Sequence, residues 1–96
     1  MRIKILESAT RDLMRGFKFY EQQKDNLGSY FLDSLFSDID SLLLTAGMHT
    51  VYFGKYRLLS KRFPFAVYYT LLNDIVLVYA VLDCRQSPHK ISKRLK

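Results

Sequence analysis

The sequence predicts one α+β domain, in which an N-terminal strand and an antiparallel helical hairpin precede a three-stranded antiparallel meander. The apolar positions recur at helical spacing in the first half of the chain and at strand-like spacing in the second half. The chain has 96 residues, 49% of them hydrophobic, so it can fill one core and is too short for two. We therefore expect a single domain over residues 1–96, ending in a basic tail at 86–96.

The first element is a short strand over residues 2–7 (RIKILE), where polar and apolar side chains alternate. Ser8 is a favourable N-cap residue, so a helix is expected over residues 9–24. Gly16 weakens this helix but allows the close approach of a neighbouring element. The apolar residues of the helix recur at Leu13, Phe17 and Tyr20.

A second helix is expected over residues 30–46, after a break at residues 26–29 (NLGS). Gly47 stands at the position where a glycine commonly ends a helix. The apolar stripe of this helix consists of Phe31, Leu35, Ile39, Leu42 and Leu43. Two helices joined by a short turn form an antiparallel hairpin.

The second half of the chain reads as a meander. Its three strands are expected over residues 55–61, 65–72 and 75–83. Pro64 can open a strand but cannot lie within a central one, so it marks where the second of these strands begins. Asn73 and Asp74 tolerate a positive φ and predict a two-residue hairpin turn. Residues 48–54 indicate either a loop or one edge strand.

The two longest predicted strands are apolar on both faces. One face is expected to pack against the helical hairpin, and the other is too apolar for full solvation. This second face should therefore be partly covered or form a partner surface. The basic tail could add one amphipathic turn, with Ile91 and Leu95 on the same side.

The net charge of +6 is unevenly distributed. Residues 1–46 hold six Lys or Arg and seven Asp or Glu, a net charge of −1, whereas residues 47–96 hold nine and two, a net charge of +7. A basic half of this kind favours a polyanion or an acidic protein surface as partner. The alternative is a solvated basic face that only aids solubility.

Other classes of protein are disfavoured by the sequence. The single cysteine, Cys84, forms no intramolecular disulfide, which fits a reducing compartment. Cys84, His49 and His89 have no spacing typical of a metal site. No apolar run has the ~20 residues of a membrane span, and the N-terminus lacks a signal-peptide pattern. We expect a cytoplasmic protein without a metal or cofactor.

Six short motifs, taken in order, resemble those of a known family. They are Ala9 with Asp12-Leu13, Phe19-Tyr20-Glu21, Leu27-Gly28, Gly54 to Leu59 (GKYRLL), Arg62 to Tyr69 (RFPFAVYY) and Ala80 to Pro88 (AVLDCRQSP). Over nearly its whole length the chain resembles the RelE/ParE superfamily of bacterial type II toxins. The fold implied by this resemblance is a strand, a helical hairpin and a three-stranded meander.

The resemblance implies a toxin that a cognate antitoxin holds inactive. RelE-like members cut messenger RNA on the ribosome, whereas ParE-like members act on DNA gyrase, so the expected target is gyrase or the ribosome and its mRNA. A homodimer or a toxin–antitoxin hetero-oligomer is compatible with this reading. The chain resembles ParE-like members more, because Ala66 stands where RelE-like nucleases have an arginine and the tyrosine after their last strand is missing, unless His89 replaces it.

A metal-independent nuclease needs cations at the phosphate and a group that transfers a proton. If the chain is a nuclease, we expect Arg57, Lys61 and Arg85 to supply the charge, with His89, or less favourably Tyr69, as the proton carrier. The residues expected to bind the target or the antitoxin are Lys55, Arg62, Lys90, Lys93 and Arg94.

Structural roles for the same residues remain alternatives. Arg57 and Arg85 could pair with Asp83 or Asp12, and such surface pairs contribute little to stability. His89 and the basic residues of the tail could simply be solvated. A family member that has lost its toxicity is a further alternative.

Overall fold

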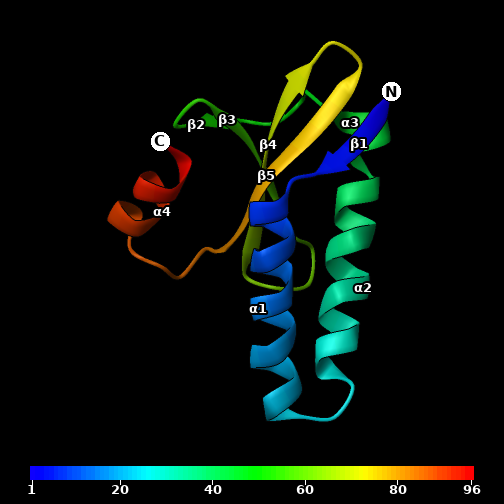
Figure 1. The fold of residues 1–96 in the computed structure, drawn as a ribbon, viewed down its shortest axis with the longest axis vertical. Coiled ribbons are helices and arrows are strands. Elements are labelled where there is room, and N and C mark those ends of the chain that lie inside the picture. Colours follow the sequence, from blue (N-terminus) through cyan, green and yellow to red (C-terminus); the bar gives the residue numbers. More distant parts are fainter.

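The structure is a computed structural model that describes all 96 residues (Figure 1). Its elements are β1 (Arg2–Ile5), α1 (Glu7–Gln23), α2 (Leu27–Asp40), α3 (Leu42–Thr45), β2 (Val51–Tyr52), β3 (Lys55–Leu59), β4 (Phe65–Leu72), β5 (Ile75–Asp83) and α4 (Pro88–Leu95). The strands form one sheet in the order β1-β5-β4-β3-β2, where β1 is parallel to β5 and the other neighbours are antiparallel. The predicted α+β fold class is confirmed, and β2 is a short edge strand.

The helices α1 and α2 lie side by side and cover one face of the sheet (Figure 1). Their apolar stripes meet the inward side chains of β4 and β5 in the larger of two core clusters. The aromatic residues Tyr20, Phe31 and Phe65 pack against one another in this cluster, with the Phe31 and Phe65 ring centroids 4.9 Å apart. This packing places the first core where the sequence predicts it, between the hairpin and the two long strands.

Two glycines let the helices approach this closely. A Cβ atom at Gly16 would lie 2.5 Å from the ring of Phe31, and one at Gly28 would lie 2.6 Å from the carbonyl oxygen of Phe17. Any larger side chain would therefore push α2 away from α1. The close neighbour expected at Gly16 is Phe31.

The predicted bounds of the second helix are wrong at both ends. Residues 27–29 belong to α2, because the turn between the helices is made earlier, at Asn26, which has a φ of +70°. The Glu21 carboxylate stabilises this turn by accepting hydrogen bonds from the Asn26 and Gly28 amides at 3.0 and 2.9 Å. The helix ends at Asp40 and resumes as α3. At the interruption, the Ser41 hydroxyl donates to the Asp38 carbonyl, a bond that commonly bends helices.

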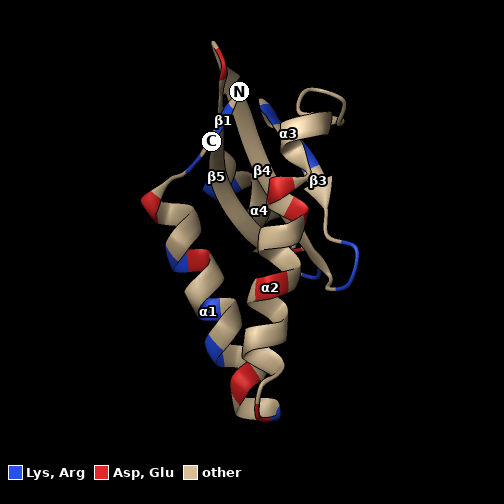
Figure 2. Cartoon of the chain, turned by 90° about the vertical axis from the view of Figure 1, so that its right-hand side faces the viewer, with Lys and Arg blue, Asp and Glu red and all other residues tan.

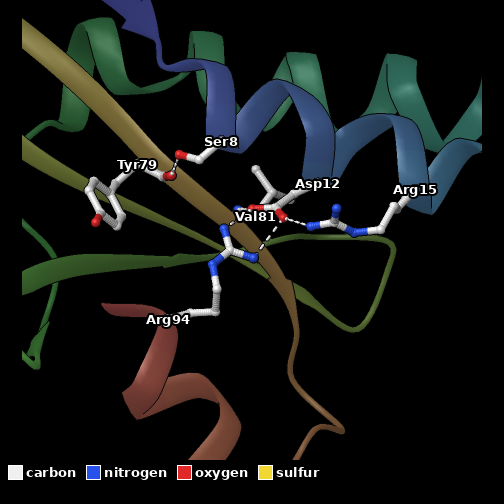
Figure 3. Close-up of polar contacts among 6 residues, drawn as sticks. All are labelled: Ser8, Asp12, Arg15, Tyr79, Val81 and Arg94. Carbon is white, nitrogen blue, oxygen red and sulfur yellow. Dashed lines mark hydrogen bonds and ion pairs between the residues drawn. The ribbon is translucent and has the colours of Figure 1, made fainter. Parts of the chain in front are cut away.

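The predicted N-cap at Ser8 is also wrong. The helix α1 begins at Glu7, after Leu6, and has no side-chain cap. Ser8 instead lies inside the first turn, and its hydroxyl donates to the Tyr79 carbonyl on β5 at 2.8 Å (Figure 3). The Ser8 hydroxyl therefore makes a tertiary hydrogen bond to β5 and does not cap the helix, the local role for which serine is favoured.

A β-bulge in β5 explains why the Tyr79 carbonyl has no partner within the sheet and accepts a hydrogen bond from Ser8 instead. Tyr68 pairs with Ala80 and Tyr69 with Val78, so Tyr79 is the extra residue. The strand β1 stops pairing at Val78, so the outer edge of β5 has no strand beside it beyond that point. There α1 completes the edge, with Ser8 at Tyr79 and the Asp12 carboxylate accepting the Val81 amide at 3.0 Å (Figure 3).

The C-terminal tail forms the two-turn helix α4, longer than the single turn expected. The Ser87 hydroxyl accepts from the Lys90 amide, and Pro88 is the first helical residue. The helix packs on the second face of the sheet, where Leu95 is 1% exposed and Ile91 is partly buried. Their partners in this second cluster are Ala66, Tyr68, Tyr79, Ala80 and Leu82. The protein's own last helix thus covers part of the face that the sequence left open for a partner.

Candidate functional site

A cavity of about 310 Å³ opens between the β2–β3 hairpin and α4, on the sheet face opposite α1 and α2. We call it the β3–α4 groove. Its walls include Tyr52, Arg57, Tyr68, Cys84, Gln86 and Ile91. The groove combines apolar side chains with one cation, two phenols, a thiol and an amide, which is the mixed lining typical of binding sites.

The cation of the groove is Arg57, in the middle of β3. Its guanidinium carbon lies 4.0 Å from the centroid of the Tyr52 ring, and one guanidinium nitrogen donates to the Tyr52 hydroxyl at 3.2 Å. Arg57 forms no ion pair with any carboxylate of the chain. The aromatic ring therefore orients the guanidinium while its charge stays available for an anionic partner.

Tyr68 is the cross-strand neighbour of Arg57 and is 3% exposed. Burial raises the pKa of its phenol above the usual value, an effect that Cys84 reinforces and Arg57 opposes. Partial burial likewise raises the pKa of the Cys84 thiol, although Arg57 lowers it. At neutral pH both groups are protonated, so the groove holds hydrogen-bond donors and no thiolate nucleophile.

Arg85 lies two residues after Asp83, the last residue of β5, and pairs with the Asp83 carboxylate. Its guanidinium donates to both Asp83 oxygens, with the closest contact at 2.7 Å, and the Arg85 amide donates to the same carboxylate at 2.8 Å. These bonds lower the pKa of Asp83 and raise that of Arg85. The pair fixes the chain just before Gln86, which lines the groove.

Lys55 and Arg94 hold α4 against the rest of the molecule. The Lys55 ammonium donates to the Leu95 carbonyl at 3.0 Å and lies 4.3 Å from the Tyr79 ring centroid. Arg94 donates two hydrogen bonds to the Asp12 carboxylate, at 2.8 and 2.9 Å (Figure 3). In the free protein both of these predicted binding residues thus have internal partners.

The remaining predicted residues lie elsewhere. Lys61 and Arg62 are in the loop after β3, which contacts α2 on the other side of the sheet. His89, Lys90 and Lys93 are exposed on α4. The cations expected to form one surface are therefore divided among the β3–α4 groove, α4 and the loop after β3. The four residues predicted for a nuclease do not lie together.

Tyr69, considered as a second proton carrier, faces the helices. It is fully buried, and its hydroxyl accepts from the Gly47 amide at 2.9 Å and bonds the His49 ring. Burial raises the pKa of this phenol. Tyr69 anchors the loop after α3 and does not reach the β3–α4 groove.

A second cavity, of about 220 Å³, lies between α1, the end of β5 and α4. Its charged residues are all engaged within the molecule: Arg15 and Arg94 contact Asp12, and Asp83 contacts Arg85. With no free charge, this cavity has less to offer a ligand than the groove around Arg57.

Sequence reasoning missed several residues of the groove. Tyr52 lies within residues 48–54, for which the sequence indicates either a loop or an edge strand, and Gln86 lies in the expected basic tail, yet both line the groove. The alternation of Lys55, Arg57 and Leu59 along β3 indicates that these residues share a face, but only the hairpin geometry shows that Tyr52 lies under Arg57.

The structure contains neither a cluster of metal ligands nor a membrane-spanning helix. No three His, Cys, Asp or Glu residues gather where they could hold a metal ion. None of the helices combines the length and apolar character needed to cross a bilayer.

The arrangement of one strand, a helical hairpin and an antiparallel meander defines a ParE-like α+β fold, as the sequence indicated. A chain in the solved structure of a chromosomal ParDE toxin–antitoxin system from P. aeruginosa has this fold, with a TM-score of 0.76 over 84% of this chain and 92% of that chain. The two chains share 15% sequence identity, so the likeness is one of fold. No family model and no curated protein matches the chain.

Proposed function

We propose that this protein is the toxin of a type II toxin–antitoxin system, that it arrests growth by binding a cellular target such as DNA gyrase, and that a cognate antitoxin neutralises it. The observation that carries the proposal is the shared fold with a chain of the ParDE system over nearly the whole domain. Fold alone does not assign a target, so the choice of residues rests on the site.

The β3–α4 groove supports a role in binding the target. Arg57 is its one cation and has no carboxylate partner, so a bound acidic or phosphate group would not have to displace an internal ion pair. Tyr68 and Cys84 lie beside Arg57 and are protonated, so they can donate hydrogen bonds to the acidic or phosphate group that Arg57 binds.

An exposed apolar surface supports a protein partner. It lies at the end of the molecule that holds both α3 and the tip of the β4–β5 hairpin (Figure 1), where a Cβ atom at Gly47, just after α3, would lie 3.3 Å from Leu71. Leu44 is 88% exposed and Met48 is 79% exposed, and Leu43, Leu71 and Leu72 are also exposed there. Grouped apolar side chains of this kind favour a contact with another chain, which under this proposal is the antitoxin.

Inducible expression tests the proposal directly. We expect growth arrest that co-expression of the protein encoded by the adjacent reading frame relieves, and inhibition of supercoiling by purified gyrase. Arg57→Ala should reduce the inhibition at least about tenfold, because charge-assisted hydrogen bonds are among the strongest polar contacts. The matched control is Lys24→Ala, an exposed cation away from the groove. Growth that continues at full expression of the wild-type protein would refute the toxin assignment.

The second candidate function is a ribosome-dependent endoribonuclease. The observation in its favour is that Arg57 and the Tyr68 phenol lie next to each other in one groove. The groove lacks a histidine, however, and the raised pKa of Tyr68 makes its phenol a poor general base. Primer extension on cellular mRNA separates the two functions, since discrete cuts within codons are expected only of the nuclease.

A further inference from the structure

A small polar cavity lies between α2 and the loop after β3. It has a volume of about 120 Å³, and its five lining residues are all polar: Ser34, Ser37, Asp38, Lys61 and Arg62. We call it the α2 notch. Neither the proposed target site nor the fold comparison gives this cavity a role.

Ser34 points to a missing binding partner in the notch. The residue is only 6% exposed, and its Oγ is the one buried side-chain polar atom of the chain without a hydrogen-bond partner. A serine within a helix commonly bonds the carbonyl one turn earlier, and Ser34 does not. Because an unsatisfied buried hydroxyl is destabilising, its position at a polar cavity indicates that a bound group completes it.

The notch also has two cations that no carboxylate neutralises. Lys61 and Arg62 are exposed and form no ion pair. The guanidinium carbon of Arg62 lies 5.9 Å from the ring centroid of Tyr30, which is one helical turn before Ser34. Tyr30 thereby favours a position of the guanidinium beside the notch.

Asp38 is already engaged within the structure. Its Oδ2 accepts from the Ser60 hydroxyl at 2.6 Å, which ties the loop to α2. With two cations and one carboxylate, the notch has a formal charge of +1. This charge matches a ligand group that carries a single negative charge.

We propose that the α2 notch binds one carboxylate side chain of a partner protein, with Arg62 and Lys61 supplying the charge and Ser34 and Ser37 donating hydrogen bonds. In naming the antitoxin as this partner, the proposal rests on the proposed function. The charge of α2 favours a protein over a nucleic acid. The helix carries Asp33, Asp38 and Asp40 and no Lys or Arg (Figure 2). A row of phosphates along α2 would therefore be repelled, whereas a single carboxylate side chain need only enter the notch.

Titration of the full chain with acetate, monitored by backbone NMR at constant ionic strength, tests the site without any toxin activity. We expect saturable shifts confined to the amides around Ser34, Ser37, Lys61 and Arg62. Ser34→Ala and Arg62→Ala should each weaken acetate binding at least about tenfold, the effect of losing one hydrogen bond to a charged group. The matched controls Ser29→Ala and Lys24→Ala, both exposed and away from the notch, should leave it unchanged.

Three outcomes would overturn the proposal. One is acetate shifts that are spread over the surface and equal to those caused by chloride. Another is a single-stranded oligonucleotide that shifts the same amides at lower concentration than acetate, which would assign the site to phosphate. The third comes from thermal unfolding without acetate: Ser34→Ala should raise the midpoint because it removes an unsatisfied hydroxyl, and a lower midpoint would show that the hydroxyl has an internal partner.

The complex with the antitoxin distinguishes this proposal from the proposed function. If the wild-type protein arrests growth and binds the antitoxin, Arg62→Ala should weaken that complex about tenfold. Unchanged affinity would reject the notch as part of the interface while leaving the toxin assignment intact. A wild-type protein without toxicity would reject the toxin assignment, and the acetate titration would still decide whether the site exists.

Discussion

The Asp12 carboxylate is 2% exposed and is shared by donors from three elements (Figure 3). Val81 on β5 donates its amide, Arg94 on α4 donates two guanidinium bonds, and Arg15 contacts the same group from the next turn of α1. Burial of a carboxylate is costly unless it is paired and hydrogen-bonded, and here both conditions are met. One side chain thus joins the first helix, the sheet and the last helix.

Asp12→Ala is expected to lower the free energy of unfolding by about 2–4 kcal/mol, because it leaves the Val81 amide and the partly buried Arg94 without their partner. Urea denaturation measures the change. The control is Glu7→Ala, which removes the exposed Glu7–Arg11 pair and should change stability by less than about 0.5 kcal/mol. Equal effects of the two substitutions would contradict the role assigned to Asp12.

The Asp83–Arg85 pair gives a pH-dependent prediction at the same scale. Because hydrogen bonds from Arg85 lower the pKa of Asp83, the stabilisation is present above the pKa of an unfolded aspartate and is lost as pH falls through the lower folded value. Arg85→Ala should raise the Asp83 pKa towards the ordinary range, as followed by carboxyl NMR titration. An unchanged Asp83 titration in this variant would show that Arg85 is not the cause.

Among the elements, α4 depends most on contacts outside itself. Eight residues make a marginal helix in isolation, so its stability has to come from packing and capping. Ser87 caps its start, Lys55 binds the carbonyl of Leu95 at its end, and Arg94 ties it to α1. The buried face of α4 is narrow, and Leu95 is its only fully buried residue.

Leu95→Ala should therefore destabilise the protein by about 2–4 kcal/mol, the usual cost of truncating a buried leucine. It should also increase hydrogen exchange along α4, because the helix loses its anchor on the sheet. Lys93→Ala, on the exposed side of the same helix, is the control and should have little effect. Slow exchange in α4 of the Leu95 variant would mean that Arg94 and Lys55 suffice to hold it.

At the scale of the whole molecule, one sheet supports both core clusters. β4 and β5 send alternate side chains to the helical hairpin and to α4, and the bulge at Tyr79 leaves Tyr79 and Ala80 both on the side of α4. Neither cluster can be exposed without loosening strands that the other cluster needs. The predicted single domain should consequently unfold as one unit.

Urea unfolding of the full chain tests this cooperativity. Tyrosine fluorescence reports tertiary packing, since the chain has seven tyrosines and no tryptophan, while far-UV circular dichroism reports helices and strands. The two midpoints should coincide. A separate early transition would show that α4 and the second cluster melt independently.

The sequence alone determined the order of the first strand, the helical hairpin and the three meander strands, and the bounds of the two longest strands, because these depend on local patterns. Runs of apolar β-branched and aromatic residues specify β4 and β5. Asn73, with its φ of +55°, suits the turn between them, and Pro64 directly precedes the first residue of β4. Gly16 likewise indicated a close neighbour without identifying Phe31.

Tertiary structure alone decided which charged and polar residues act inside the molecule. Ser8 and Asp12 complete an edge of β5 that exists only because β1 ends early and Tyr79 bulges, so no local pattern could reveal their roles. Arg94 is drawn inward by Asp12, 82 positions away in sequence, while Arg57 keeps its charge free. A net charge is a sum over the sequence, but the availability of each charge depends on which partners the fold brings within hydrogen-bonding distance.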